Sequence, residues 1–468
     1  MPESVKKPKN IVICCDGTGN RFGNTNSNVV KLYTCLIVDG EQVAYYHPGL
    51  GTMGDPNKST WVGRQTSKIA GLAFGRGFRA NMADAYRFLM SVYSNGDRVF
   101  LFGFSRGAYT VRALAGALYM YGLLCPGNEG HLPYLLEMFS DESRRAFSSE
   151  GEKRLKVTQL SEAFRETFSR SIAIHFIGVW DTVSSIGWIY DPVKLLFDGQ
   201  NPIVRKGRHA ISVDEHRCFF QDSLWGPPLP PGETPVLREA SVRGNEQQDI
   251  VQTWFAGVHS DVGGSYLQSE CAPAMDALKW ILDEAEADGL LIHQRKREAI
   301  FGLPSSEHTA LESMYPAVIS ALHCLHNSLT WKWWIFECFP HKYHDASGKK
   351  HWRFLPWAHR RELPDGAILH PSLRRRLNED ASYKPKNLST SSIYDFSESP
   401  VPLPQSEVMA QLQAQRFGVY RRSAPAGRFV PRKSEGNSAL PIPDPFNPSP
   451  PSSLPPPTKW TTSSRSSP

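Results

Sequence analysis

The sequence predicts an α/β fold in which a mostly parallel β-sheet is covered by helices on both faces. Short apolar runs of strand length alternate along the chain with longer segments of helical periodicity. One such run, residues 98–102, leads directly into the motif Gly103–Gly107 and then into a helical segment. Strands that alternate with helices favour parallel pairing, because each helix returns the chain to the same edge of the sheet.

The individual elements follow from local residue patterns. Apolar, β-branched or aromatic runs bounded by turn residues predict strands, and apolar residues repeated every three or four positions predict helices. Two polar or weakly patterned segments, about residues 126–170 and 300–385, are expected to be insertions that cap the sheet or form a lid. The expected strands are residues 11–15, 42–46, 98–102, 172–180 and 251–258, and the expected helices are residues 29–36, 81–93, 108–118 and 273–287.

Composition limits the classes of partner. The chain has 468 residues, of which 40% are hydrophobic, so it can form a sizeable core. A net charge of +6 is small for this length. It does not indicate nucleic-acid binding, and it is compatible with weak attraction to an anionic lipid surface. No run approaches the ~18 apolar residues of a membrane span. The run at residues 11–15 is too short for a signal peptide, so we expect a cytoplasmic protein.

The motif Gly103–Gly107 reads G-x-S-x-G and is typical of a nucleophile elbow, the sharp strand-to-helix turn of α/β-hydrolases. The motif alone is weak evidence, because an ordinary turn between a strand and a helix can have the same residues. The flanking strand and helix favour the elbow. In that case Ser105 stands at the apex, with its hydroxyl raised above the sheet.

A serine hydroxyl needs a base to take its proton and an acid to orient that base. In α/β-hydrolases the acid and the histidine follow the serine in that order, at the carboxyl ends of strands. Asp181 and His259 directly follow two expected strands. We therefore predict Ser105 as nucleophile, His259 as base and Asp181 as acid. Each assignment has an alternative. Asp181 could only cap a turn, and His259 could only make structural hydrogen bonds. Asp261 could be the acid, or it could only hold the shape of the loop.

Negative charge that develops on the substrate requires two N–H donors. One is expected to be the backbone N–H of Arg106, the residue after the nucleophile. The second is expected from a loop near the first strands, where Gly17 and Thr18 are the candidates. Asp16 would brace this loop by accepting N–H bonds, or would form only a local turn. This chemistry implies neither a metal nor an organic cofactor.

The blocks at residues 15–20, 103–108, 178–183, 208–215 and 257–264 resemble an uncharacterised α/β-hydrolase family with many fungal members. That family includes the phospholipase effectors of bacterial type VI secretion. The resemblance covers about residues 10–385. It implies a Ser-Asp-His hydrolase with Ser105, Asp181 and His259 in those roles. For the characterised bacterial members it implies release of fatty acid from phospholipids.

Residues 1–395 are therefore expected to form an α/β-hydrolase-like catalytic domain, followed by a tail at residues 396–468. The tail is rich in Pro and Ser, a composition that cannot bury enough apolar surface to offset chain entropy, so we expect it to be disordered. Pro-rich segments dock into aromatic grooves of partner domains. The tail is accordingly a candidate partner-binding segment.

The leading hypothesis is a serine hydrolase that cleaves a carboxylic ester, with a (phospho)lipid as the candidate substrate. One alternative is a catalytically silent hydrolase-fold protein that recruits partners through its tail. Another is a phosphatase of the haloacid-dehalogenase type, because residues 15–18 resemble its opening motif. The residue at the position of its nucleophilic Asp is Cys14, which cannot form an aspartyl-phosphate.

The segment Trp331–Phe339 is strongly aromatic, and Arg353, Arg360 and Arg361 follow it. Trp-rich segments favour the membrane–water interface. A lipid-facing surface is therefore one interpretation of this region. The other is that the rings pack in the core or in a lid.

Overall fold

The computed structural model describes most of the chain up to residue 396. The Pro/Ser-rich tail beyond it, for which disorder and partner binding are expected, lies outside the described residues. The described residues are 7–49, 67–148, 159–183, 186–188, 191–193, 201–218, 220–226, 248–303, 310–316, 325–337, 341–344, 350–353, 360–364, 366–388 and 395–396.

A parallel sheet of eight strands forms the centre of this part of the chain, in the order β14-β13-β10-β9-β6-β3-β1-β2. Each neighbouring pair is parallel. The predicted fold class is therefore confirmed. The strands are β1 Asn10–Cys15, β2 Gln42–His47, β3 Arg98–Phe104, β6 Ile174–Trp180, β9 Val204–Ser212, β10 Asp249–Phe255, β13 Ile368–Leu369 and β14 Asp395–Phe396.

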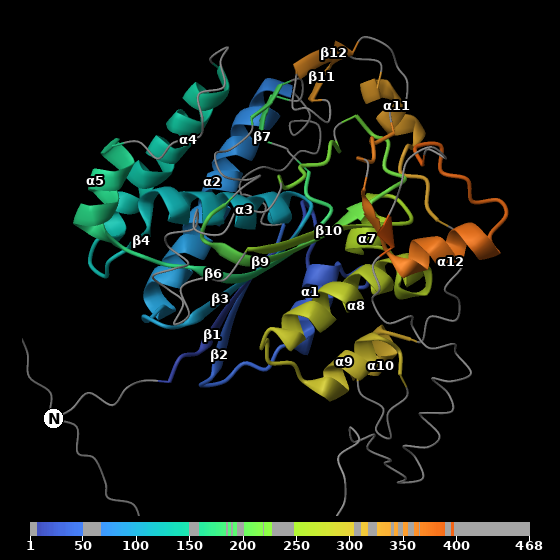
Figure 1. Cartoon of the computed structure of the whole chain (residues 1–468), viewed down its shortest axis with the longest axis horizontal. Helices are drawn as coiled ribbons and strands as arrows, with labels where there is room; N and C mark the ends of the chain where they lie inside the picture. Colours follow the sequence, from blue (N-terminus) through green and yellow to red (C-terminus); the bar gives the residue numbers. More distant parts are fainter. Residues whose placement is uncertain are drawn as a thin grey trace, which may run out of the picture. The chain divides into compact units, whose positions relative to one another are not determined.

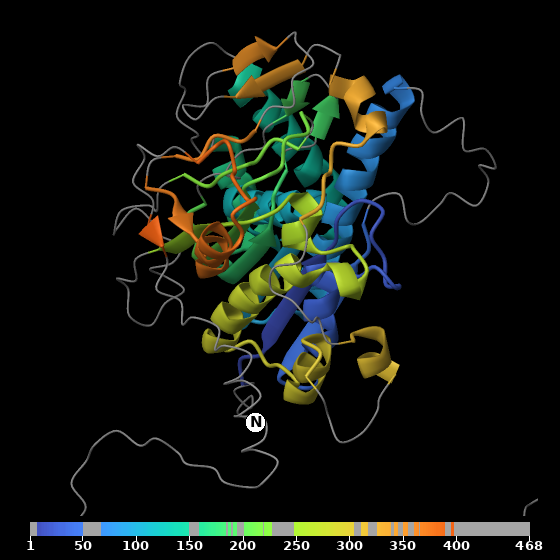
Figure 2. The ribbon, with the colours of Figure 1, turned by 90° about the vertical axis from the view of Figure 1, so that its right-hand side faces the viewer.

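Helices cover both faces of the sheet (Figure 1 and Figure 2). Side chains alternate along a strand, so Ile11 and Ile13 of β1 join one core cluster while Val12 and Cys14 join the other. The first cluster includes residues of α2 Ser67–Val92, α3 Arg106–Tyr121, α4 Leu132–Ser148 and α5 Gln159–Phe168. The second includes residues of α1 Asn28–Cys35, α8 Ala272–Ala287, α9 Gln294–Ile300 and α10 Ala310–Met314.

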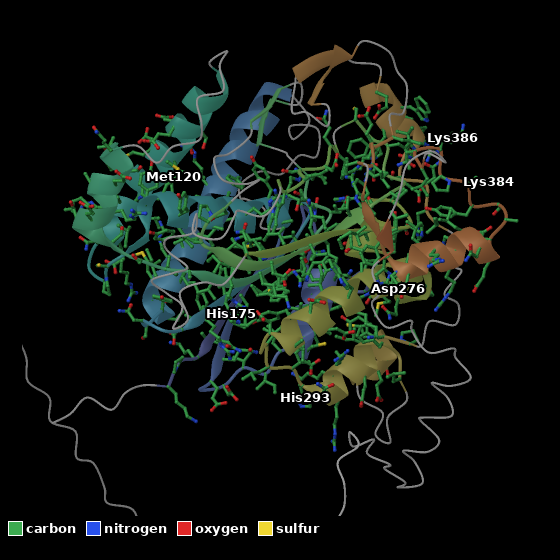
Figure 3. All side chains as sticks on the ribbon, viewed as in Figure 1. Met120, His175, Asp276, His293, Lys384 and Lys386 are labelled. Carbon is green, nitrogen blue, oxygen red and sulfur yellow. The ribbon has the colours of Figure 1, made fainter. Side chains whose placement is uncertain are left out.

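These two clusters supply the apolar burial that stabilises the sheet. Met120 of α3 is fully buried in the first cluster, and Asp276 lies on α8 at the opposite face (Figure 3). Phe102 of β3 is completely buried in the second cluster. Burial of one such side chain stabilises the fold by roughly 1.5–3 kcal/mol relative to exposure.

Strand β9 is missing from the sequence-based prediction, and its composition explains why. It contains Arg208 and His209, which are rarely buried, yet both are buried here. Arg208 forms ion pairs with Asp249 at 2.7 Å and with Glu284 at 2.8 Å. A charged residue in a central strand is thus compensated by partners that are distant in sequence.

Two other predicted segments have clear outcomes. Helix α2 begins at Ser67, well before the expected start at residue 81. The insertion expected at residues 126–170 contains α4 and α5, which pack against the α2 and α3 layer.

No helix among the described residues is both long enough and apolar enough to cross a membrane.

The strand order brings the functional candidates to one edge of the sheet. The chain passes from β1 to β2 on one side and from β3 to β6 on the other, so the strand order reverses between β1 and β3. In parallel sheets such a switch point opens a crevice at the carboxyl ends of the strands. Asp16 follows β1, Ser105 follows β3, Asp181 follows β6, and His259 lies just beyond β10.

Candidate active site

Ser105 occupies a strained turn between β3 and α3. Its backbone angles are φ 57° and ψ −121°, which a non-glycine residue rarely adopts. The flanking glycines permit the turn. A Cβ atom on Gly103 would lie 2.6 Å from the backbone nitrogen of Ala108, and one on Gly107 would lie 2.1 Å from the carbonyl oxygen of Cys15. The local sequence therefore produces the geometry of a nucleophile elbow.

Ser105, His259 and Asp181 form one continuous chain of hydrogen bonds. The Ser105 Oγ atom lies 2.8 Å from His259 Nε2, and His259 Nδ1 lies 2.5 Å from Asp181 Oδ2. An ionised carboxylate can only accept hydrogen bonds, so Nδ1 carries the ring proton. Nε2 is then the acceptor for the Ser105 hydroxyl. This tautomer is the one that a general base requires.

Asp181 is completely buried and held by several donors. Its Oδ1 atom accepts hydrogen bonds from the Ser212 backbone N–H at 2.8 Å and from the Ser212 hydroxyl at 3.0 Å. Both carboxylate oxygens also accept from the guanidinium of Arg361. Burial alone would raise the pKa of Asp181, but Arg361 and His259 outweigh it and hold the pKa well below its usual range. The carboxylate is therefore ionised at neutral pH.

His259 is the first residue of the short helix α7 His259–Gly263. Its backbone N–H donates to Glu215 Oε2 at 3.1 Å. Its ring contacts the rings of Phe104 and Phe220, with centroid distances of 4.6 and 4.7 Å. Burial lowers the pKa of His259, and the neighbouring Asp181 partly opposes that effect. The imidazole is consequently neutral at physiological pH and able to accept a proton.

Asp261, the alternative acid, lies elsewhere in the hydrogen-bond network. Its Oδ2 atom accepts from the backbone N–H groups of Val258 at 3.0 Å and His326 at 3.1 Å. Its Oδ1 atom lies 2.6 Å from His326 Nδ1. Asp261 thus fixes the loop that carries His259, whereas Asp181 contacts the His259 ring.

Asp16 holds together the loop beside Ser105. Its carboxylate accepts from the backbone N–H of Gly17 at 2.7 Å, the Asn20 amide at 3.1 Å, the Ser27 hydroxyl at 2.7 Å and the Tyr46 hydroxyl at 2.9 Å. Burial raises the pKa of Asp16, and these donors oppose the shift. The polar bracing expected of Asp16 is therefore present in the geometry.

The same loop carries Gly17 and Thr18, the two candidate loop donors to a substrate oxyanion. A Cβ atom on Gly17 would lie only 3.2 Å from Ser105 Cβ, so the loop passes directly beside the serine. The Gly17 N–H, one of the two candidate loop donors, already donates to Asp16. The Thr18 hydroxyl oxygen is buried and has no hydrogen-bond partner among the described residues. Arg106 is the first residue of α3 and lies at the positive end of its dipole.

Four residues near the site were not identified from sequence: Glu215, Phe220, His326 and Arg361. Glu215 lies within a block that resembles the family, but its hydrogen bond to the His259 backbone depends on the fold. The position of Arg361 differs from the interpretation that placed it on a lipid-facing surface. It is only 6% exposed and pairs with Asp181, so it does not belong to a lipid-facing surface. A separation of 180 residues from Asp181 gives no sequence signal.

The Trp-rich segment has both a packed side chain and exposed side chains. Its described part forms α11 Trp331–Glu337. Trp333 lies 5.4 Å from Phe220, ring centroid to ring centroid, and so belongs to the aromatic surroundings of His259. Trp331 and Trp334 are 70% and 44% exposed. Residues 338–339 and the side chain of Arg353 lie outside the described residues.

Two known proteins are similar to parts of this chain. The chain is 34% identical over 230 residues to the uncharacterized protein YEL023C of Saccharomyces cerevisiae, which covers 47% of this chain and 33% of the yeast protein. A crystal structure of an uncharacterized protein from Pseudomonas aeruginosa aligns with a TM-score of 0.35 and 16% identity, over 66% of this chain and 49% of that chain. The chain therefore matches only part of each relative.

A family model gives the clearest relationship. The model described as "T6SS, Phospholipase effector Tle1-like, catalytic domain" matches residues 9–284. This range contains Ser105, Asp181 and His259, and it covers more than half of the chain. The resemblance seen in the sequence blocks is thus confirmed: the chain belongs to the family of T6SS phospholipase effector Tle1-like catalytic domains.

Proposed function

We propose that this protein is a serine hydrolase that cleaves a carboxylic ester of a phospholipid or related lipid through an acyl-enzyme. The observation that carries the proposal is the hydrogen-bond chain from Ser105 through His259 to Asp181. Its chemistry is that of nucleophilic catalysis with an activated hydroxyl. Membership of a phospholipase effector family supports the lipid ester as substrate.

In the first half-reaction the Ser105 Oγ atom attacks the ester carbonyl carbon while His259 Nε2 takes the hydroxyl proton. Asp181 stabilises the imidazolium that results. The tetrahedral intermediate then collapses, the ester C–O bond breaks, and the alcohol leaves with the proton from His259. The product of this step is an acyl group bound to Ser105.

In the second half-reaction water attacks the acyl carbon and gives its proton to His259. The bond to Ser105 Oγ breaks, the serine recovers its proton, and the fatty acid is released. Both tetrahedral intermediates carry a negative oxygen. We assign its stabilisation to the backbone N–H of Arg106 at the start of α3 and to Thr18, whose buried hydroxyl would also lie close to the substrate.

A peripheral membrane contact through α11 would bring lipid to this site. Trp331 and Trp334 expose large amphipathic rings, a side chain type that favours the membrane–water interface. Trp333 of the same helix reaches Phe220, whose ring contacts His259. The exposed tryptophans therefore lie one helix turn or less from the aromatic surroundings of the base.

The proposal is tested by incubating the purified protein with mixed phospholipid vesicles and with a soluble short-chain ester. Fatty acid and lysophospholipid are quantified by mass spectrometry. Wild type should hydrolyse both substrates, and Ser105→Ala should lower the rate by a factor on the order of 10³ or more. Hydrolysis by wild type no faster than by Ser105→Ala on every ester would overturn the proposal. That result would favour a catalytically silent binding protein.

A further inference from the structure

The strongest unassigned feature of the site is Arg361, which enters it from the side opposite Ser105 in the hydrogen-bond chain. Its Nη1 atom lies 2.5 Å from Asp181 Oδ1 and its Nη2 atom lies 3.1 Å from Asp181 Oδ2. The pairing is bidentate, and both side chains are buried, with relative exposures of 4% and 0%. Arg361 also lies outside the range matched by the family model, which ends at residue 284.

The two Nη atoms of Arg361 also bind the surroundings of the same carboxylate. Nη1 also donates to the Ser212 hydroxyl at 2.7 Å and the Ser212 carbonyl at 3.1 Å, and Nη2 donates to the Phe220 carbonyl at 2.7 Å. Ser212 itself donates two hydrogen bonds to Asp181, and the Phe220 ring contacts His259. One guanidinium therefore connects the end of β9, the end of β6 and the aromatic wall beside the base.

We propose that Arg361 is a positioning residue that sets the basicity of His259 by sharing the negative charge of Asp181. This inference rests on the proposed serine-hydrolase function. A bidentate arginine–carboxylate pair fixes the plane of the carboxylate, so it directs Oδ2 toward His259 Nδ1. It also offsets part of the charge that would otherwise stabilise the imidazolium. His259 consequently stays neutral to a lower pH than in a triad without this cation.

Other charged and titratable groups surround the pair and act in both directions. Glu215 accepts the His259 backbone N–H and is paired with Arg217 at 2.9 Å. Asp222 is half-buried, and desolvation raises its pKa although Arg361 partly opposes the shift. His209 accepts the Thr182 N–H at 3.1 Å, and burial lowers its pKa to about 3. Of these groups only Arg361 contacts both oxygens of Asp181.

Three variants of neighbouring arginines test the inference. Arg361→Met removes the charge and the planar fork, Arg361→Lys keeps the charge but loses the fork, and Arg360→Met is the matched control. Arg360 lies 3.8 Å from Asp214 and is 35% exposed, so it has no part in the Asp181 pair. The measurement is kcat/KM against pH on a soluble ester, with the rate of fluorophosphonate labelling at Ser105 as an independent readout.

For Arg361→Met we expect the acidic limb of the pH profile to move upward by about half a pH unit or more, with kcat lower by a factor of about 10–100. Arg361→Lys should keep the acidic limb within about 0.3 pH units of wild type, since the charge remains, and lower kcat by about tenfold at unchanged KM. Arg360→Met should match wild type in both respects.

Two results would overturn the inference. The first is an acidic limb that does not move in Arg361→Met, since a merely structural role lowers the rate without changing the titration of His259. The second, which applies even if Arg361→Met is insoluble, is a kcat for Arg361→Lys equal to that of wild type. Failure of the proposed function itself is distinguishable, because wild type would then show no fluorophosphonate adduct on Ser105.

Discussion

Asp181 and His259 meet across a strand that belongs to neither of them. Asp181 follows β6 and His259 follows β10, yet Asp181 Oδ2 lies 2.5 Å from His259 Nδ1, and β9 runs between the two strands. The contact is achieved because Asp181 adopts a positive φ of 39° and the end of β9 places Ser212 behind its carboxylate. The last residue of β9 therefore supports the acid rather than supplying it.

This arrangement predicts unequal effects for the two aspartates near His259. Asp181→Asn should lower kcat by a factor on the order of 10³–10⁴, because an amide cannot hold the His259 tautomer in the same way. Asp261→Asn should retain more activity, since Asp261 contacts Val258 and His326 instead of the His259 ring. Steady-state kinetics on a soluble ester compares them. The opposite ranking would assign the acid role to Asp261.

The exposed tryptophans of α11 should matter for lipid surfaces and not for soluble substrates. Trp331→Ala combined with Trp334→Ala should lower hydrolysis of vesicle phospholipid by about tenfold or more, because interfacial Trp side chains are lost. Hydrolysis of a soluble ester should stay within about twofold of wild type. Tyr134→Ala on α4, whose side chain is 54% exposed, is the control. Equal vesicle rates in all three proteins would exclude α11 as a docking surface.

The buried His209 should make the free energy of unfolding depend on pH. It is completely buried, and burial lowers its pKa to about 3, against about 6.5 in the unfolded chain. The unfolded state therefore binds more protons, so stability is fully present above pH 6.5 and is lost as the pH falls toward 3. From pH 7 to pH 5 the free energy of unfolding should fall by about 2 kcal/mol from this residue alone.

Urea unfolding at the two pH values measures this change. His209→Gln keeps an acceptor for the Thr182 N–H but does not titrate, so its free energy of unfolding should vary less with pH than that of wild type. An identical pH dependence in the two proteins would show that His209 does not cause it.

Removal of residues 397–468 should leave the fold and the ester hydrolase activity unchanged. The truncation keeps β14, which includes Phe396 paired with Leu369 and so extends one residue beyond the boundary expected from composition. The unfolding midpoint and the kcat of the truncated protein should equal those of the full chain. A collapse of soluble yield would mean that the tail belongs to the folded domain.

Local sequence signals indicate the candidate residues. The elbow motif depends on five consecutive residues and their flanks, which point to Ser105, and the polar residues after two apolar strands point to Asp181 and His259; the structure brings these three side chains into hydrogen-bond contact. No local signal exists where burial is compensated over long separations. The ion pairs that allow Arg208 into β9, and the pair that brings Arg361 to Asp181, leave no local pattern. Short strands such as β13 are too brief for any periodicity.

The choice between Asp181 and Asp261 illustrates the same limit. Both follow an apolar strand within a few residues, and only the folded contacts distinguish them: Asp181 Oδ2 lies 2.5 Å from His259 Nδ1, whereas Asp261 contacts Val258 and His326. Likewise, sequence offered Gly17 and Thr18 equally as oxyanion donors. The hydrogen bond from Gly17 to Asp16 separates them, and it depends on the folded loop.

The most direct test of the account is whether His259 activates Ser105 as a nucleophile. Purified protein is treated with a fluorophosphonate, and the adduct is located by peptide mass spectrometry. Wild type should carry one adduct on Ser105, Ser105→Ala should carry none, and His259→Ala should be labelled more slowly by a factor of about 100 or more. Folded wild type without an adduct on Ser105, or His259→Ala labelled as fast as wild type, would contradict the account.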